Sequence, residues 1–342
     1  MLYKPYLAIG RLKEKDEGGR MKDEREKVKV EGGKMKDENR VTSSPKQDIV
    51  LFRIPHPSSF LFCLYAYFRL IRPINGLIAF MAVILGAFLA GSNSDSLGKV
   101  IITAIAALLL LSAGNALNDF YDIETDKINR PLRPIPSGHI KRRSALIFAI
   151  ALFILGASLG LFVSRAALIV AIIVSILLVF YTTKLREFIL IGNIVIGLLT
   201  GLTFVSGGIA SESIGRSFIP ATFAFLFITG REIVKDIQDI KGDRAAGMLS
   251  LPLKWGQRKS VYISLIFLAM VIIISPIPYV LNIYSFYYLI CVIFGVDLVM
   301  VYCIWILLKA PLEKSAAKVA NLMKFDIFIG LGAIYIGNIG LV

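Results

Sequence analysis

Six aspartates form two groups with identical spacing, a pattern that points to chemistry. Each group reads D-x2-D-x3-D, and each aspartate of the second group lies 117 positions after its counterpart in the first. The six residues are Asp119, Asp122, Asp126, Asp236, Asp239 and Asp243. On a helix, positions i, i+3 and i+7 lie on one face, so we expect each group to form one acidic stripe on one helix.

Carboxylates beside hydrocarbon are costly unless a cation compensates their charge. Mg²⁺ is a hard ion that takes oxygen ligands and commonly joins one or two carboxylates to substrate phosphates. Two facing stripes therefore predict that the six aspartates hold Mg²⁺ together with a bound diphosphate. Two alternatives stay open at this point: ordinary solvated acids at the ends of membrane spans, and a path for cation transport.

Basic and polar side chains near the aspartates favour an anionic ligand over a bare cation. Arginine offers phosphate oxygens a planar fork of donors, and three prolines stop a helix and stiffen the loop that carries two of the arginines. For each basic residue taken singly, membrane topology alone is an alternative explanation. The residues singled out are Asn115, Arg130, Arg133, Tyr181, Lys184, Arg231 and Lys235.

Long apolar segments must position these groups. Of the 342 residues, 56% are hydrophobic and 18% are charged, whereas a soluble domain carries roughly 25% charged residues. This composition excludes soluble globular, disordered and fibrous proteins. A membrane span needs ~20 apolar residues, and nine segments of the chain meet this need. The sequence therefore predicts an all-α polytopic membrane protein, a bundle of nine transmembrane helices. The expected spans are 64–90, 98–120, 143–163, 166–183, 188–210, 217–238, 259–280, 283–308 and 319–341.

The loops between these spans alternate between basic and weakly charged. With nearby span ends included, nineteen Lys and Arg residues lie on one side, and three lie on the other: Lys99, Arg165 and Arg216. Because cytoplasmic loops carry the excess of positive charge, we expect the basic side to be cytoplasmic. Nine spans in the cell membrane then place the N-terminus inside and the C-terminus outside, with both aspartate groups and the active site on the cytoplasmic side.

Residues 1–56 differ from the rest of the chain. They contain 14 of the 38 Lys and Arg and 10 of the 24 Asp and Glu, with too little apolar area to offset chain entropy. We expect a disordered, charged cytoplasmic extension, followed by a nine-span domain over 57–342. The formal net charge of +14 suits loops that face anionic membrane lipids, so no nucleic-acid partner is expected. The sequence implies no protein partner.

Four motifs together resemble those of the UbiA-type intramembrane prenyltransferases, over about residues 65–340. They are Arg72-Pro73-Ile74-Asn75, Asn115 to Asp126 with Arg130-Pro131-x-Arg133-Pro134, Tyr181 to Lys184 followed by Gly192-Asn193, and Arg231 to Asp243. The resemblance implies a nine-helix bundle around a central cavity open to the cytoplasm and to lipid, in which the two acid motifs bind Mg²⁺ and an isoprenyl diphosphate. The chain departs from the family at Lys241, where an acid is common.

Three shorter runs are most similar to archaeal members of this family that make ether lipids. They are Leu70–Asn75, Gly201–Gly208 and Arg231–Asp236. This similarity implies transfer of a geranylgeranyl group from geranylgeranyl diphosphate to the hydroxyl of a lipid-like acceptor, geranylgeranylglyceryl phosphate, which forms the second ether bond. An aromatic acceptor, as in quinone biosynthesis, is the alternative within the family. An ion or lipid transporter is the alternative outside it.

The same resemblance implies a role for each residue. The metal would be held by Asp119, Asp122, Asp236 and Asp239, with Asp126 and Asp243 in support. A developing diphosphate anion would be stabilised electrostatically, with Lys184 as a catalytic cation. The residues expected to bind the diphosphate or the acceptor are Asn75, Asn115, Asn118, Arg130, Arg133, Tyr181, Arg231 and Lys235. Arg72 is the candidate seat for the acceptor's own phosphate.

Overall fold

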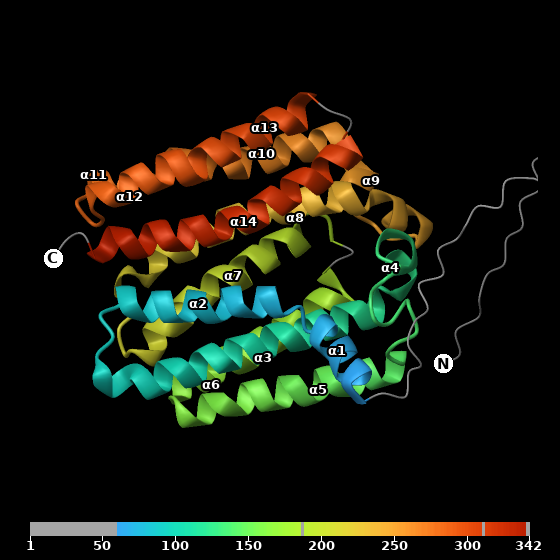
Figure 1. Ribbon diagram of the computed structural model, residues 1–342, viewed down its shortest axis with the longest axis horizontal. Helices are drawn as coiled ribbons and strands as arrows, with labels where there is room; N and C mark the ends of the chain where they lie inside the picture. The colour runs from blue at the N-terminus through green and yellow to red at the C-terminus, as the bar shows by residue number, and fades with distance from the viewer. Residues whose placement is uncertain (1–59, 186–187, 310–311, 340–342) are drawn as a thin grey trace, which may run out of the picture. The chain divides into compact units, whose positions relative to one another are not determined.

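The computed structural model describes residues 60–185, 188–309 and 312–339, and the predicted extension over 1–56 lies outside them. All regular elements within the described residues are helical (Figure 1). The α-helices are α1 (Phe60–Leu70), α2 (Pro73–Leu89), α3 (Leu97–Tyr121), α4 (Ile123–Asn129), α5 (Arg142–Ser158), α6 (Arg165–Thr183), α7 (Ile191–Ala210), α8 (Phe218–Ala245), α9 (Leu251–Trp255), α10 (Gln257–Ile274), α11 (Ile277–Val280), α12 (Phe286–Cys291), α13 (Leu298–Lys309) and α14 (Leu312–Ile339). Short turns of tighter or wider helix are η1 (Ser94–Ser96), η2 (Leu159–Phe162), η4 (Gly215–Ser217) and η5 (Val292–Asp297).

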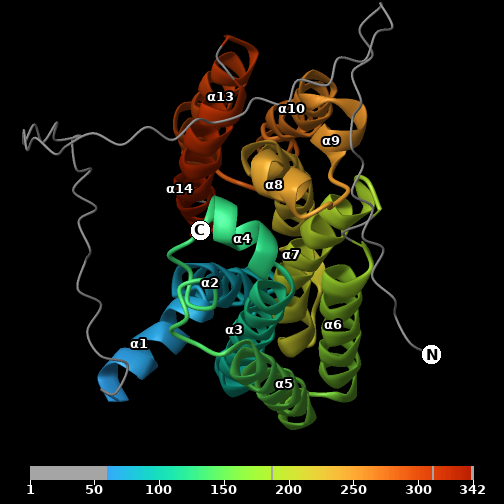
Figure 2. The ribbon, with the colours of Figure 1, turned by 90° about the vertical axis from the view of Figure 1, so that its right-hand side faces the viewer.

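Eight helical segments among the described residues are long and apolar enough to cross a membrane. A ninth span arises if the bent pair Leu61–Leu70 and Pro73–Leu89 is counted as one crossing. The predicted all-α, polytopic architecture is therefore confirmed. Figure 2 looks along the bundle from the end that carries α4 and α9.

The first span is not the continuous helix over 64–90 that the hydropathy predicts. Its two halves, α1 and α2, are bent by 54° at Arg72, whose φ is +52°. Pro73 disfavours helical backbone at the residue before it, and an L-residue at positive φ carries strain of the kind that clusters at functional sites. The break sets Arg72 at the start of α2, where its side chain contacts α3.

Glycines allow α2 and α7 to pack backbone against backbone. A Cβ atom on Gly207 would lie 2.0 Å from the carbonyl oxygen of Val83, and one on Gly86 would lie 2.1 Å from the carbonyl oxygen of Phe204. Small residues at a helix crossing let two backbones approach closely, which is how membrane helices gain packing energy without a hydrophobic drive. This crossing fixes one wall of the bundle interior.

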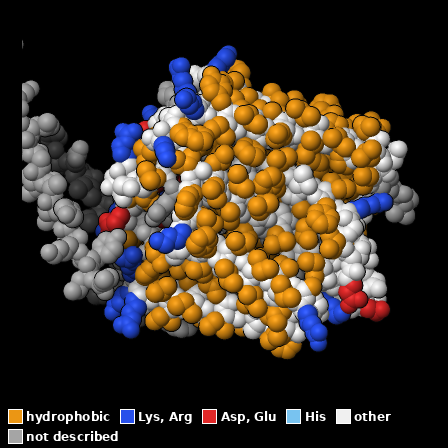
Figure 3. All heavy atoms as spheres, turned by 180° about the vertical axis from the view of Figure 1, so that it is seen from behind, with side chains coloured by type: hydrophobic (Ala, Val, Ile, Leu, Met, Phe, Trp, Pro, Cys, Tyr) orange, Lys and Arg blue, Asp and Glu red, His pale blue; other side chains and the backbone are white. Residues whose placement is uncertain are grey.

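The bundle exposes apolar side chains where a soluble protein would expose polar ones. On one face, hydrophobic side chains cover the middle, and most Lys and Arg lie toward its margins (Figure 3). The span from Ser94 to Tyr121 is the most enclosed, with 61% of its apolar window buried, whereas the span Arg165–Thr183 has 22% buried. Thus α3 is central, and α6 presents much of its surface to lipid.

Candidate functional site

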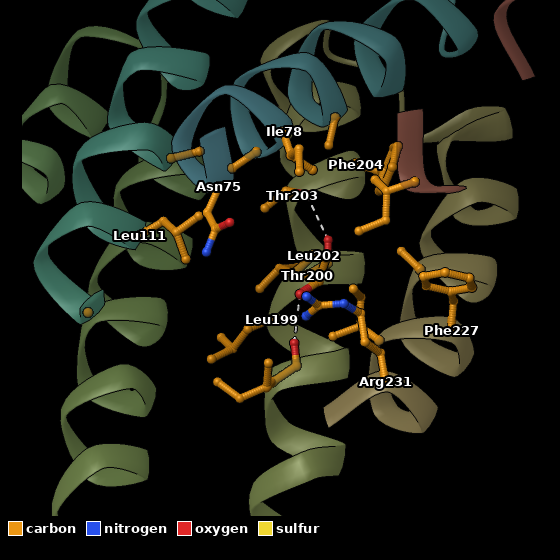
Figure 4. Close-up of a pocket in the computed structure, with 18 of the residues that line it drawn as sticks. Asn75, Ile78, Leu111, Leu199, Thr200, Leu202, Thr203, Phe204, Phe227 and Arg231 are labelled. Atoms are coloured by element: carbon orange, nitrogen blue, oxygen red, sulfur yellow. Dashed lines mark hydrogen bonds between the residues drawn. The ribbon is translucent and has the colours of Figure 1, made fainter. Parts of the chain in front are cut away.

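A cavity of about 540 Å³ lies among α2, α3, α6, α7, α8 and α14. Much of its wall is aliphatic or aromatic, including Ile78, Leu111 and Phe227, whereas Arg231 extends into it from α8 (Figure 4). The structure therefore joins polar groups to a largely apolar chamber. Nine residues singled out from the sequence line it: Arg72, Asn75, Asn115, Asn118, Arg130, Arg133, Tyr181, Arg231 and Lys235.

The first aspartate group does not form the single helical stripe that its spacing predicts. Helix α3 ends at Tyr121, Asp122 follows as its cap, and a separate helix, α4, begins at Ile123. The Asn118 side-chain amide donates to Asp122 Oδ2 at 2.7 Å. The backbone of Asp122, with φ −85° and ψ +10°, departs from helical geometry and marks the break. Asp119 therefore lies on α3 and Asp126 on α4.

Two arginines tie the first group together. Arg133 donates to Asp119 Oδ1 at 3.0 Å and to Asp126 Oδ2 at 2.5 Å, so one guanidinium links both helices. Arg72 forms a second hydrogen-bonded ion pair with Asp119 and also donates to Asn115 Oδ1 at 3.3 Å. Asn115 in turn donates to the carbonyl of Ile71 at 3.1 Å, directly at the bend between α1 and α2. The strained bend is thereby held against α3.

The second aspartate group lies on one continuous helix, α8, as its spacing predicts. Asp239 accepts two hydrogen bonds from Arg130, each 2.8 Å long. The guanidinium of Arg130 also lies 3.8 Å from Asp126, so it connects the two groups. Asp236 accepts a 2.8 Å bond from Asn193 of α7, and Asp243 is buried.

A further contact fixes α4 against α8. The Asn129 side chain donates to the carbonyl of Asp239 at 2.9 Å and accepts from the backbone N–H of Gly242 at 3.1 Å. A Cβ atom on Gly242 would lie 2.3 Å from Asn129 Nδ2, so only glycine leaves room for this side chain. The two aspartate groups are thus held together by backbone contacts as well as by Arg130.

Burial and ion pairing shift the pKa values of three side chains that lie outside the membrane spans, those of Asp126, Arg130 and Arg133. Burial raises the pKa of Asp126, although Arg133 opposes this shift. Burial acts to lower the pKa of Arg130, but the charges of Asp239 and Asp126 outweigh it and raise that pKa. Burial, with repulsion from Arg72, lowers the pKa of Arg133. Arg130 is therefore held firmly cationic between the two aspartate groups.

Three of the six aspartates, Asp119, Asp126 and Asp239, are paired with arginines. Within the described part of the chain, no three His, Cys, Asp or Glu side chains are placed to hold a metal ion together. The arginines that pair with these aspartates line the cavity, whereas none of the six aspartates is among its lining residues. The donor set nevertheless fits a hard divalent cation. The candidate ligands are carboxylate oxygens, the donors that such an ion prefers. Asp126 and Asp239, one from each group, both lie beside the positive charge of Arg130.

Two basic residues on α8 and one just after α6 have different surroundings. Arg231 and Lys235 line the cavity and share the carboxylate of Glu232, at 3.3 Å and 2.6 Å. Lys184, the residue after α6, is exposed and lies outside the cavity lining. The structure does not bring Lys184 to the aspartates, so its catalytic role stays a prediction.

Three charged residues that line the cavity, Glu232, Lys324 and Asp326, were not singled out as site residues from the sequence. Lys324, in the middle of α14, lines the cavity, yet in the sequence it counts only toward the positive charge of the cytoplasmic side. The signal that could have found it is a lysine inside an apolar span, since such residues face a bundle interior or a cavity.

Comparison with known proteins agrees with this geometry. The sequence profile of the UbiA prenyltransferase family matches residues 79–328. A digeranylgeranylglyceryl phosphate synthase from Methanosphaera stadtmanae is 36% identical over 271 residues, which make up 79% of this chain and 98% of that protein. A solved structure described as a digeranylgeranylglyceryl phosphate synthase in membranes is 38% identical, with a TM-score of 0.65 over 81% of this chain and 99% of that one.

A more distant solved structure has the same fold. It is a UbiA homolog from Archaeoglobus fulgidus bound to GPP and Mg²⁺, 16% identical, with a TM-score of 0.59 over 79% of this chain and 99% of that one. The profile match covers most of the chain and includes both aspartate groups. The chain belongs to the UbiA prenyltransferase family and is a multi-pass membrane enzyme that transfers prenyl groups.

Proposed function

We propose that this protein transfers a geranylgeranyl group from geranylgeranyl diphosphate to the hydroxyl of geranylgeranylglyceryl phosphate, which forms an ether bond. The observation that carries the proposal is a largely apolar cavity lined by Arg130, which is paired with aspartates of both groups, and by Arg133, which is paired with two aspartates of the first group. Such a chamber suits a long isoprenoid with a charged head. Similarity to enzymes named for this product supports the choice of acceptor.

The six aspartates are the residues that would hold Mg²⁺, with Asp119, Asp122, Asp236 and Asp239 as the main ligands and Asp126 and Asp243 in support. The UbiA homolog bound to GPP and Mg²⁺ supports this choice of ion. When bound, the ion would neutralise negative charge on the diphosphate.

The chain's own residues bind and orient the diphosphate. Arg130 and Arg133 present paired donors that suit phosphate oxygens, and Asn118 adds an amide at the same cavity wall. The bond between C1 and the bridging oxygen breaks, and the diphosphate leaves with the electron pair. The acceptor hydroxyl attacks the allylic cation, and its proton passes to the departing diphosphate as the ether bond forms. The apolar wall excludes water, which would otherwise capture the cation.

The site belongs on the cytoplasmic side of the cell membrane, with the N-terminus inside and the C-terminus outside. The excess of Lys and Arg at the ends that carry the aspartate groups supports this orientation. A soluble diphosphate made in the cytoplasm could then reach the arginines directly, while the isoprenoid tail lies along the apolar helices.

Diphosphate release from purified protein in detergent tests the reaction class. Geranylgeranyl diphosphate is supplied with and without geranylgeranylglyceryl phosphate, in EDTA or in Mg²⁺. We expect release that requires both the acceptor and the metal, since ionisation needs charge compensation and the acceptor must capture the cation before it recombines with the diphosphate. A transporter would release no diphosphate in detergent, where no gradient exists, and that result would overturn the proposal.

A further inference from the structure

The basic residues that line the cavity fall into two groups that differ in charge balance. The first group is Arg72, Arg130 and Arg133, and each of these arginines is paired with an aspartate of the two motifs. The second consists of Arg231 and Lys235 on α8 and Lys324 on α14, which we call the Lys324 cluster. Its members have one carboxylate between them, that of Glu232.

The Lys324 cluster therefore carries an uncompensated excess of positive charge. Three cations against one carboxylate leave an excess of two. Lys324 forms no hydrogen bond or ion pair with any residue in the described part of the chain, and the charges of Arg231, Arg72 and Lys235 all act on it. The Nε atom of Arg231 is buried and likewise lacks a partner there.

A second acid near Lys324 does not supply the missing charge. Asp326 also lines the cavity, but both of its carboxylate oxygens are buried without a hydrogen-bond partner among the described residues. Asp326 therefore forms no hydrogen-bonded ion pair with Lys324 among the described residues. Unpaired cations inside a membrane protein are costly, so the excess at the Lys324 cluster calls for an anion from outside the chain.

We propose that the Lys324 cluster binds the phosphate of the acceptor, while the arginines paired with the aspartates serve the diphosphate of the donor. This inference rests on the proposed function. A phosphate monoester carries about −2 charge at pH 7, which matches the excess of two positive charges. Because the two substrates bring two separate anionic heads into one cavity, two separate cationic seats are needed. Arg72, the residue expected from the sequence to bind this phosphate, is paired with Asp119 of the first aspartate group and so belongs with the arginines that serve the donor.

Separate binding sites for the two anionic groups have a consequence for which acceptors the protein selects. A neutral acceptor, such as geranylgeranylglycerol without its phosphate, can use the apolar wall but not the Lys324 cluster. The cluster therefore acts as a specificity element that favours phosphorylated acceptors. Loss of one charge-assisted bond should weaken binding of the phosphorylated acceptor about tenfold and leave binding of the donor unchanged.

The test compares Lys324→Gln with Lys318→Gln in the full-length purified protein. Lys318 lies on the same helix but is exposed and bonds to Tyr302, so it is the matched control. KM is measured for geranylgeranyl diphosphate, for geranylgeranylglyceryl phosphate and for geranylgeranylglycerol. We expect Lys324→Gln to raise KM about tenfold for the phosphorylated acceptor only, Lys318→Gln to change none, and Lys324→Arg to restore the wild-type value.

Other outcomes separate this inference from the proposed function. An equal rise in KM for the diphosphate, or an unchanged KM for the phosphorylated acceptor, would overturn the assignment of the seat while the reaction stands. If the wild-type protein does not turn over this acceptor, equilibrium binding of radiolabelled geranylgeranylglyceryl phosphate still decides the matter. Weaker binding to Lys324→Gln than to Lys318→Gln supports the seat, and equal binding refutes it.

Discussion

Arg130 and Arg133 organise the site at the scale of single residues. Each bridges carboxylates that come from different helices, so each is both a structural link and a donor toward the cavity. Sequence spacing identified these arginines and the six aspartates because charged residues are rare among the spans. Spacing could not show that Arg72 is paired with Asp119, because that contact depends on the bend before α2. Nor could it single out Lys324, whose role depends on which side chains face it across the cavity.

Asp236→Asn tests the role of the second aspartate group. The exchange keeps the size of the side chain but removes a charge from the proposed metal site, so we expect kcat to fall by about 100-fold or more. The measurement is turnover at saturating Mg²⁺ and saturating substrates. Asp95→Asn, in an exposed turn before α3, is the control and should keep full activity. A normal rate in Asp236→Asn would remove this residue from the metal site.

The sequence predicts the number of membrane-spanning helices well, but it predicts poorly where a helix bends or ends. Hydropathy located the nine apolar segments because each needs to cover the hydrocarbon. It could not show the bend at Arg72 or the end of α3 at Tyr121, because an average over a window does not register a change at one or two residues. Pro73 was a usable signal for the first break. At the second, the spacing of the aspartates suggested a longer helix than the structure has.

Gly207→Ala tests the close crossing of α2 and α7. The added methyl group would lie 2.0 Å from the carbonyl oxygen of Val83, so the helices must separate, at a cost of about 1–3 kcal/mol. We expect a lower midpoint of thermal unfolding in detergent. Gly332→Ala on α14 is the matched control, since its added Cβ would meet nothing within 4 Å. Equal midpoints for the two variants would show that the crossing tolerates a larger residue.

At the scale of the whole molecule, the nine-span domain should be sufficient for catalysis. The alignment with the Methanosphaera stadtmanae relative covers 98% of that protein but only 79% of this chain. The family profile begins at residue 79. The charged extension over 1–56 contains neither aspartate group.

Deletion of residues 2–48 should therefore leave turnover and both KM values within about twofold of the full-length protein. The assay uses membranes with matched amounts of inserted protein, measured by immunoblot. Loss of activity in correctly inserted protein would give the extension a role in catalysis or in substrate delivery.

The most direct test of the whole account is the identity of the product when acceptors compete. Purified protein receives geranylgeranyl diphosphate and Mg²⁺ with equal concentrations of geranylgeranylglyceryl phosphate and a hydroxybenzoate, and mass spectrometry identifies the products. The account predicts one dominant product, the phosphorylated glycerol diether that carries two geranylgeranyl chains. A prenylated aromatic ring as the main product would contradict it.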